Sequence, residues 1–232
     1  MSLAGKTIAI TGAARGLGQE FARHLATLGA NLVVGDVNDC GATVELVTAA
    51  GGKATSVTLD VTDPASARAM VEAGLAAFGR LDGLVNNAAL YGALKGGRFD
   101  GIPESEWDAC MAVNVKGIWN CCKAAVPAMR QEGGSIVNIA SLAATYGMPY
   151  GLHYTTSKAA VIGADPRSRA RVGARPYSGQ RAGAERGADR RHQRILWRQA
   201  RPRTGGGQSR ADDPAQSGAG RPHRHGGVAP LG

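Results

Sequence analysis

The sequence has few cysteines, no long apolar run and, beyond residue 158, no lysine. Its four cysteines show neither the paired spacing of a zinc site nor the density of a disulfide scaffold, so we expect no metal site. No apolar run approaches the roughly 18 to 20 residues of a membrane span, and the first residues lack the apolar region of a signal peptide. These absences favour a cytoplasmic protein with no membrane segment.

The formal charge of +9 is distributed unevenly along the chain. Residues 1 to 163 contain 12 Lys and Arg against 13 Asp and Glu, whereas residues 164 to 232 contain 15 Arg against 5 acidic residues. The second segment has only 7 large apolar residues among 69, too few to offset the entropy lost on ordering. We therefore predict a domain over residues 1 to 163 and a disordered tail, rich in Arg, Gly, Ala and Pro, over residues 164 to 232.

The first 163 residues alternate between short apolar runs and longer amphipathic segments. Strands are predicted at 6–11, 31–36, 53–59, 81–87 and 135–139, and helices at 17–28, 40–50, 64–78 and 104–130. Strands that alternate with helices favour a parallel sheet with right-handed crossovers. The fold class is therefore α/β, with a doubly wound parallel sheet.

A glycine-rich turn joins the first predicted strand to the first helix. Gly12, Gly16 and Gly18 allow the backbone to approach a pyrophosphate, whose charge would lie at the positive end of the helix. A packing turn without a ligand is the alternative. Asp36 ends the second strand, where a carboxylate can bind both adenine-ribose hydroxyls and repel a 2′-phosphate. NAD is therefore favoured over NADP, although Arg15 in the turn could pair with that phosphate.

A second group of candidate residues lies near the end of the predicted domain. Tyr154 and Lys158 are four residues apart, so in a helix they share one face. Lys158 can lower the pKa of the phenol, which would make Tyr154 a proton donor or acceptor near neutral pH. Ser141 follows the fifth strand, where its hydroxyl could meet the same substrate carbonyl. Asn114 lies inside the long helix, where an amide would otherwise indicate a kink or an exposed position.

Together these residues resemble the short-chain dehydrogenase/reductase family, of the classical type. The resemblance covers residues 4 to 163 and implies a Rossmann-type fold that binds a nicotinamide dinucleotide. At residues 86 to 89 this chain has Asn-Asn-Ala-Ala, whereas the family usually has Asn-Asn-Ala-Gly. The cofactor-binding residues that the resemblance and the turn indicate are Gly12, Arg15, Gly16, Leu17, Gly18, Asp36, Asp60, Val61, Asn87, Ala88, Tyr154 and Lys158.

The resemblance also implies a role for each candidate catalytic residue. Tyr154 is the general acid and base, and Ser141 polarises the substrate oxygen. Lys158 binds the nicotinamide ribose and tunes Tyr154, and Asn114 holds a water of a proton relay. The cofactor supplies the hydride, while the protein supplies orientation and the proton. The expected reaction interconverts a secondary alcohol and a ketone.

The chain departs from the family after Gly163. The family's sixth and seventh strands, its nicotinamide loop and its lid are not recognisable there, so we expect the sheet to be incomplete. A proline at residue 166 disfavours continuation of the catalytic helix. Re-reading the degenerate codons of residues 164 to 174 in another frame permits Leu-Thr-Arg-Ala-Leu-Ala-Arg-Glu-Leu-Gly, which would continue that helix. We therefore hypothesise that the tail is family sequence read out of frame.

The alternative is a dinucleotide-binding remnant with a basic tail that binds nucleic acid or another polyanion. Fifteen arginines could contact phosphates, but only Tyr177 and Trp197 in that segment could stack on bases. Nucleic-acid binding is therefore the less favoured interpretation. As printed, the chain is expected to bind NAD weakly and to turn over little, since the nicotinamide pocket would lack a wall.

The substrate is expected to be a hydrophobic or aromatic alcohol or ketone. Five apolar, aromatic or imidazole side chains flank the expected cleft, although each could equally serve packing: Tyr91, Leu94, Tyr146, Met148 and His153. His153 is interpreted as a surface or orienting residue rather than a second base. By the family resemblance the protein forms a tetramer through its long helices and last strand, and the missing last strand puts this assembly in doubt.

Overall fold

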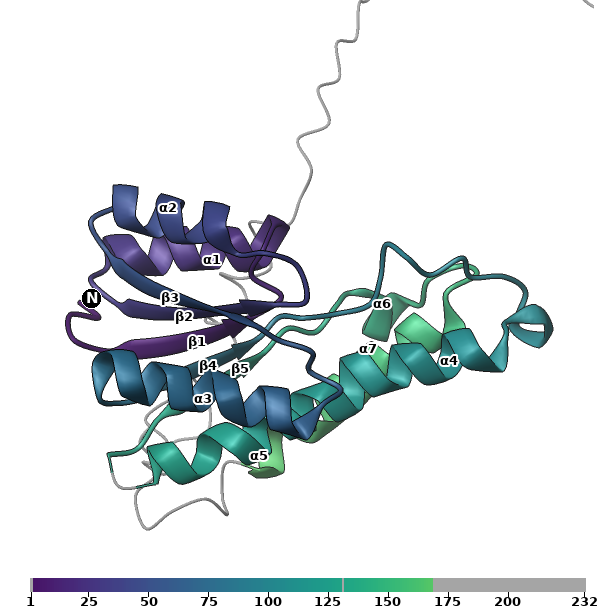
Figure 1. The fold of residues 1–232 in the computed structure, drawn as a ribbon. Helices are drawn as coiled ribbons and strands as arrows, with labels where there is room; N and C mark the ends of the chain where they lie inside the picture. The colour runs from purple at the N-terminus through teal and green to yellow at the C-terminus, as the bar shows by residue number, and fades with distance from the viewer. Residues whose placement is uncertain (1, 131, 169–232) are drawn as a thin grey trace, which may run out of the picture. The chain divides into compact units, whose positions relative to one another are not determined.

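The structure is a computed structural model that describes residues 2–130 and 132–168. Five parallel strands form one sheet in the order β3-β2-β1-β4-β5 (Figure 1). The strands are β1 (Thr7–Thr11), β2 (Asn31–Asp36), β3 (Lys53–Thr58), β4 (Gly83–Asn86) and β5 (Ser135–Asn138). The predicted α/β fold with a parallel, doubly wound sheet is confirmed.

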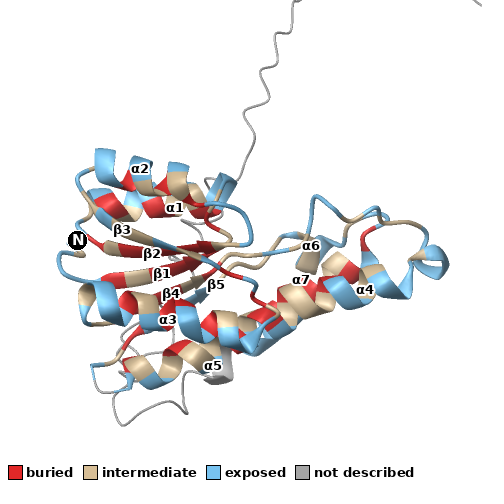
Figure 2. Cartoon of the chain, viewed as in Figure 1, coloured by how far each residue is buried: buried red, intermediate tan, exposed pale blue. Residues whose placement is uncertain are grey.

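Helices cover both faces of this sheet. α1 (Gly16–Thr27) and α2 (Gly41–Ala49) lie on one face, and α3 (Pro64–Phe78) and α5 (Gly117–Met129) lie on the other (Figure 1). Successive residues of a strand point to opposite faces, so Leu32 and Val34 pack with the first pair of helices and Val33 with the second. Most residues of β1 and β2 are buried (Figure 2). Burial on both faces explains why these strands are continuously apolar.

The remaining elements lie or begin beyond the carboxyl ends of the strands, and α7 runs back from there toward α5 (Figure 1). They are η1 (Phe99–Gly101), α4 (Glu104–Met111), η2 (Ala112–Lys116), α6 (Ala143–Tyr146) and α7 (Leu152–Ser168). η1 and α6 were not predicted. The predicted helix 104–130 is divided, because one turn of π-helix, η2, separates α4 from α5. The other predicted boundaries agree with the structure within about two residues.

The helix that contains Tyr154 and Lys158 continues further than the sequence predicted. α7 runs to Ser168 and so includes residue 166, where a proline was expected to end it. The fixed φ of proline is compatible with a helix, so a helix can pass through one at the cost of a backbone hydrogen bond. The predicted domain boundary after residue 163 stays a prediction, and nearly all of the tail lies outside the described residues. Within the described residues, β5 pairs with β4 alone.

Candidate active site

The predicted site residues gather at the carboxyl edge of the sheet. The glycine-rich turn follows β1, Asp36 is the last residue of β2, Asn87 follows β4 and Ser141 follows β5. Because all five strands are parallel, their carboxyl ends lie along the same edge. The fold therefore brings together residues that lie up to 129 positions apart in the sequence, from Gly12 to Ser141.

Asn87 holds the glycine-rich turn in place. Its side-chain amide donates hydrogen bonds to the carbonyl oxygens of Thr11 at 3.0 Å and Gly12 at 2.9 Å. The Thr11 hydroxyl oxygen accepts in return from the amides of Asn87 at 3.1 Å and Ala88 at 3.0 Å. A Cβ at Gly12 would lie 2.7 Å from the Cα of Ala88, so no larger residue fits there. Asn87 and Ala88 thus shape the turn itself, and their expected contact with a cofactor stays a prediction.

The first turn of α1 is suited to an anion. Arg15 is the N-cap residue, its side chain makes no capping hydrogen bond, and the first turn contains no acidic residue. Gly16 has a φ of +61°, and a Cβ built on it would meet nothing within 4 Å, so the backbone is open to an approaching ligand. A Cβ at Gly18 would instead collide with the Gly12 carbonyl oxygen. Leu17 and Arg15 are exposed beside this space, which fits a pyrophosphate.

Asp36 is the last residue of β2, and its carboxylate is held by hydrogen bonds, one of them from the glycine-rich turn. Its Oδ2 accepts from the Ala14 amide at 3.1 Å, and its Oδ1 accepts from the backbone and side-chain amides of Asn38, both at 3.0 Å.

Two further predicted residues follow β3. Asp60 is exposed and accepts from the amide and hydroxyl of Thr62 at 2.8 and 2.7 Å. The Val61 side chain lies in the core, so its contribution to the edge is through its backbone.

Tyr154 and Lys158 share one face of α7, as predicted. The Lys158 ammonium lies 5.8 Å from the centre of the Tyr154 ring and donates a hydrogen bond to the Ile139 carbonyl oxygen at 2.8 Å. The Ser141 hydroxyl, in the loop after β5, lies near enough to the Tyr154 phenol to lower its pKa. The Ser141 oxygen also accepts from the Ala143 amide at 3.2 Å, which orients it at the start of α6. Phenol, hydroxyl and ammonium therefore meet at the carboxyl edge of the sheet.

Burial controls the protonation of this group. Burial raises the pKa of the Tyr154 phenol, and the hydrogen bond from Ser141 only partly opposes that effect. Lys158 is 3% exposed, and its burial lowers the pKa of the ammonium to about 8. The expectation that Lys158 lowers the pKa of the phenol is not met in this structure, because the ammonium bonds to a carbonyl oxygen and the phenol is desolvated.

Asn114 lies in the π-helical turn η2 and is completely buried. Its side-chain oxygen accepts from the Leu90 amide at 2.7 Å, and its side-chain nitrogen donates to the Leu90 carbonyl oxygen at 3.1 Å and the Ser157 hydroxyl at 3.0 Å. The amide thus connects the loop after β4 to α7. The side chain is engaged in protein contacts, and its expected role toward a water stays a prediction.

A pocket of about 290 Å³ adjoins the Tyr154 ring. The Tyr91 and Tyr154 rings lie 4.8 Å apart between centres. The other lining residues come from the loop after β4, the loop before α7 and the first turn of α7: Gly92, Leu94, Lys95, Gly96, Met148, Pro149, Tyr150, Gly151 and His153. Four of the five predicted cleft residues line this pocket; Tyr146 does not, and it is 81% exposed.

The pairing of Glu106 with His153 was not found in the sequence. His153 was interpreted as a surface or orienting residue, but its side chain is buried and its Nε2 lies 2.8 Å from Glu106 Oε1. Glu106 is one of several acidic residues in and near α4, and no local motif marks it. The residues are 47 positions apart, so only their arrangement in space reveals the pair.

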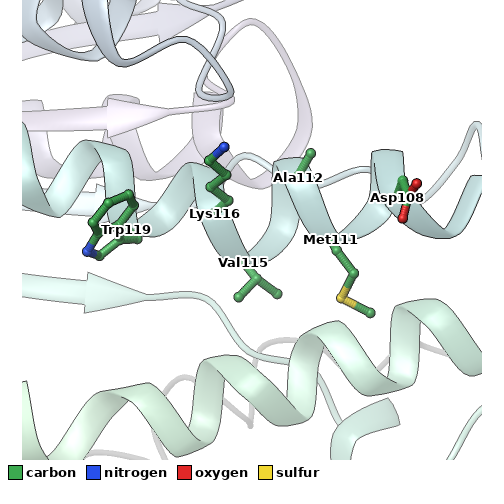
Figure 3. A pocket seen from close by; sticks show the side chains of 6 residues that line it. All are labelled: Asp108, Met111, Ala112, Val115, Lys116 and Trp119. Atoms are coloured by element: carbon green, nitrogen blue, oxygen red, sulfur yellow. The ribbon is translucent and has the colours of Figure 1, made fainter. Parts of the chain in front are cut away.

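A larger pocket of about 510 Å³ lies on the outer face of α4, η2 and α5. Figure 3 shows its lining side chains on consecutive turns of these helices: Asp108, Met111, Ala112, Val115, Lys116 and Trp119. Trp119 is 57% exposed. None of these residues belongs to the group around Tyr154.

Among the described residues, no helix has the length and apolar character needed to cross a membrane.

Known proteins are similar to this chain in sequence and in fold. A 3-oxoacyl-[acyl-carrier-protein] reductase of Thermotoga maritima is 38% identical over 166 residues, which are 70% of this chain and 66% of that protein. A 2,5-dichloro-2,5-cyclohexadiene-1,4-diol dehydrogenase of Sphingobium indicum is 40% identical over 168 residues, 69% of this chain and 64% of that protein. The matched part of the chain therefore spans less than two thirds of these relatives.

A short chain dehydrogenase from Mycobacterium paratuberculosis bound to NAD has a similar structure, with a TM-score of 0.66 and 34% sequence identity. The match covers 70% of this chain and 65% of that one. The family model described as short chain dehydrogenase matches residues 6–169, which include the glycine-rich turn, Ser141, Tyr154 and Lys158. The chain therefore belongs to the short-chain dehydrogenase/reductase family.

Proposed function

We propose that this protein is an NAD-dependent oxidoreductase that interconverts a secondary alcohol and a ketone. The observation that carries the proposal is the meeting of the Tyr154 phenol, the Ser141 hydroxyl and the Lys158 ammonium beside a pocket and near an anion-binding turn. The printed names of two relatives, an oxoacyl reductase and a diol dehydrogenase, describe chemistry at a carbonyl or carbinol carbon and support the same reaction class.

The proton in this reaction moves through Tyr154. Its raised pKa keeps the phenol protonated at neutral pH, so that it can donate the proton to a substrate carbonyl oxygen. The Ser141 hydroxyl, which reaches the same phenol, donates a hydrogen bond to that oxygen and polarises the carbonyl. The Lys158 ammonium lies 5.8 Å from the ring centre and is held on the same face of α7 by the Ile139 carbonyl oxygen. In the opposite direction the phenolate accepts the proton of the alcohol.

The residues at the opening turn fit a dinucleotide. The uncapped first turn of α1 and the open backbone at Gly16 would hold the pyrophosphate, and Asp36 would hold the adenine ribose. Bound NAD supplies the acceptor or donor of the hydride. We propose NAD rather than NADP because the Asp36 carboxylate would repel a 2′-phosphate. Lys158 is proposed to contact the nicotinamide ribose as well.

The pocket beside Tyr154 suits a hydrophobic or aromatic substrate. Tyr91, Met148 and Tyr150 supply apolar and aromatic surface, and the Tyr91 ring lies directly against the Tyr154 ring. A pocket of about 290 Å³ is at the small end of the range for ligand sites, so a small substrate is favoured.

The test is removal of the phenolic hydroxyl. We expect Tyr154→Phe to lower kcat at least about 100-fold while the Kd for NAD changes less than threefold, because general acid and base catalysis contributes about 10² to 10⁴. The assay follows NADH absorbance with a panel of aromatic and aliphatic alcohols, and compares NAD with NADP. It is run on the chain as given and on a version with the restored reading frame.

The matched control is Tyr146→Phe, because Tyr146 is exposed and does not line the pocket. Its kcat should remain within twofold of the wild-type value. Turnover by Tyr154→Phe at the wild-type rate would refute the proposed function.

A further inference from the structure

Two loops form the walls of the pocket beside Tyr154. One comprises residues 91–97 after β4, and the other comprises residues 148–151 before α7. The Gly97 amide donates to the Tyr150 carbonyl oxygen at 2.9 Å, and a Cβ at Gly96 would collide with that same oxygen. Tyr150 has a φ of +61°. Among the described residues it is the one non-glycine residue with a positive φ. The loops are thus held together in a conformation that costs free energy and needs support from neighbouring residues.

Glu106 on α4 supplies part of that support. Its Oε1 accepts from the Gly96 amide at 2.9 Å and its Oε2 accepts from the Lys95 amide at 3.2 Å. The hydrogen bond from Gly96 is the main reason why the pKa of this carboxyl lies below its usual range. The charged carboxylate therefore fastens the first loop to α4.

His153 connects the same carboxylate to the catalytic helix. Its ring is buried in the first turn of α7, directly before Tyr154, and Nε2 lies 2.8 Å from Glu106 Oε1. A carboxylate only accepts hydrogen bonds, so Nε2 carries the hydrogen. Nδ1 is buried and, among the described residues, has no hydrogen-bond partner. One carboxylate thus joins α4, the first loop and α7.

We propose that Glu106 and His153 form a positioning pair that fixes the shape of the pocket and thereby determines how tightly the substrate binds. Glu106 acts through the loop walls, and His153 acts through them in addition to lining the pocket; neither side chain is part of the group formed by Tyr154, Ser141 and Lys158. The term substrate here rests on the proposed function. Loss of the pair should raise KM much more than it lowers kcat, because α7 and the loop after β5 still hold the catalytic groups.

Two substitutions at His153 separate the bond from the bulk of the ring. In His153→Gln the side-chain nitrogen can reach the position of Nε2 and donate to Glu106, whereas in His153→Asn it reaches only the position of Nδ1. We expect His153→Asn to raise KM at least tenfold with kcat within threefold, and His153→Gln to retain wild-type constants within about threefold. A merely structural role would lower the folded fraction in both variants without this separation of KM from kcat.

Hydrogen exchange measured by mass spectrometry tests the pair without any turnover. The amides of Lys95, Gly96 and Gly97 each donate a hydrogen bond at this junction. Peptides that contain residues 95–97 should exchange at least tenfold faster in His153→Asn than in the wild-type chain or His153→Gln. Peptides from the turn after β1 should not change.

Gly96→Ala provides a second route if His153→Asn does not fold, because it disturbs the same junction from the loop side. Its control is Gly101→Ala, since a Cβ at Gly101 meets nothing within 4 Å. Unchanged exchange in both His153→Asn and Gly96→Ala would overturn the proposal, as would faster exchange with an unaltered KM. If neither the chain as given nor its version with the restored reading frame turns over any substrate, the proposed function fails, and the exchange result alone decides whether the pair fixes the loops.

Discussion

At the scale of single residues, burial rather than pairing determines how the catalytic group is charged. Lys158 and Tyr154 are both desolvated, and in each case burial is the largest cause of the pKa change. Burial disfavours the charged form, so the ammonium loses its proton more easily and the phenol holds its proton more tightly. The pKa values of the two groups thus move apart, so the phenol keeps its proton above the pH at which the ammonium loses its own.

The lowered pKa of Lys158 predicts how stability depends on pH. The pKa is about 8 in the folded chain and 10.5 in the unfolded chain, so between these values the unfolded chain binds more protons. The free energy of unfolding contributed by this group therefore rises with pH from about 8 to about 10. Relative to Lys158→Met, the wild-type chain should gain stability over that interval, as measured by urea unfolding at pH 7, 8, 9 and 10.

The comparison with Lys158→Met removes the contributions of other titrating groups, Tyr154 included. The variant also loses the hydrogen bond to Ile139, which changes the size of the difference but not its trend with pH. Lys123→Met, at an exposed position on α5, controls for the loss of a lysine as such. A difference between wild type and Lys158→Met that stays constant from pH 7 to 10 would contradict the lowered pKa.

Sequence reasoning predicted a residue's place correctly where that place depends on near neighbours in the chain. The glycine-rich turn and the spacing of Tyr154 and Lys158 are local patterns, and their positions at a strand end and on one helix face follow from regular geometry. It failed where function depends on long-range pairing. The contacts of Asn114 with Leu90 and Ser157, and of Glu106 with His153, join residues 24, 43 and 47 positions apart. No periodicity in the sequence encodes those distances.

At the scale of elements, the π-helical turn η2 is the departure from regular structure that serves the site. A π-turn inserts a residue into a helix and re-aims the side chains there. Here it lies between α4 and α5 and directs Asn114 into the space between the loop after β4 and α7. The sequence predicted a single helix over residues 104–130 because its apolar pattern continues through the insertion. The asparagine was the one local sign of irregularity.

Replacement of Asn114 should therefore destabilise the domain. Asn114→Ala removes hydrogen bonds to the Leu90 amide, the Leu90 carbonyl and the Ser157 hydroxyl, and leaves these polar groups without a side-chain partner. We expect the free energy of unfolding to fall by about 2 to 3 kcal/mol, as measured by urea unfolding. Glu72→Ala, at an exposed position on α3, should change it by less than about 0.5 kcal/mol. An equal effect of the two substitutions would show that Asn114 does not join these elements.

At the scale of the whole molecule, the outer face of α4, η2 and α5 points to self-association. Its pocket is mostly apolar and carries Asp108 near one end and Lys116 toward the other (Figure 3). In a contact between two copies with antiparallel helices, Asp108 of one copy can face Lys116 of the other, so the face is complementary to itself. We therefore propose that the protein is a homo-oligomer and that this face takes part in its assembly.

Trp119→Glu should disrupt that assembly, because it places a charge in the exposed apolar part of the face. Sedimentation velocity of the wild-type chain should show a dimer or larger species, and the variant should sediment as a monomer. Phe99→Glu is the matched control, since Phe99 is 77% exposed but lies on η1, away from this face. A monomeric wild-type chain, or an unaltered mass for Trp119→Glu, would contradict the proposal.

The reading frame after residue 163 decides whether the molecule can function as proposed. The family match continues to residue 169 and α7 to Ser168, so the helical character persists for a few residues past the point where the composition changes. Within the described residues, β5 has one strand neighbour, and Val137 on it is 37% exposed. An unpaired strand edge promotes association with other chains.

We expect the nucleotide sequence to reveal a base gained or lost near codon 163. Restoring the frame should then tighten NAD binding at least tenfold in calorimetry and reduce aggregation in light scattering, whereas an intact frame in the gene would exclude this explanation.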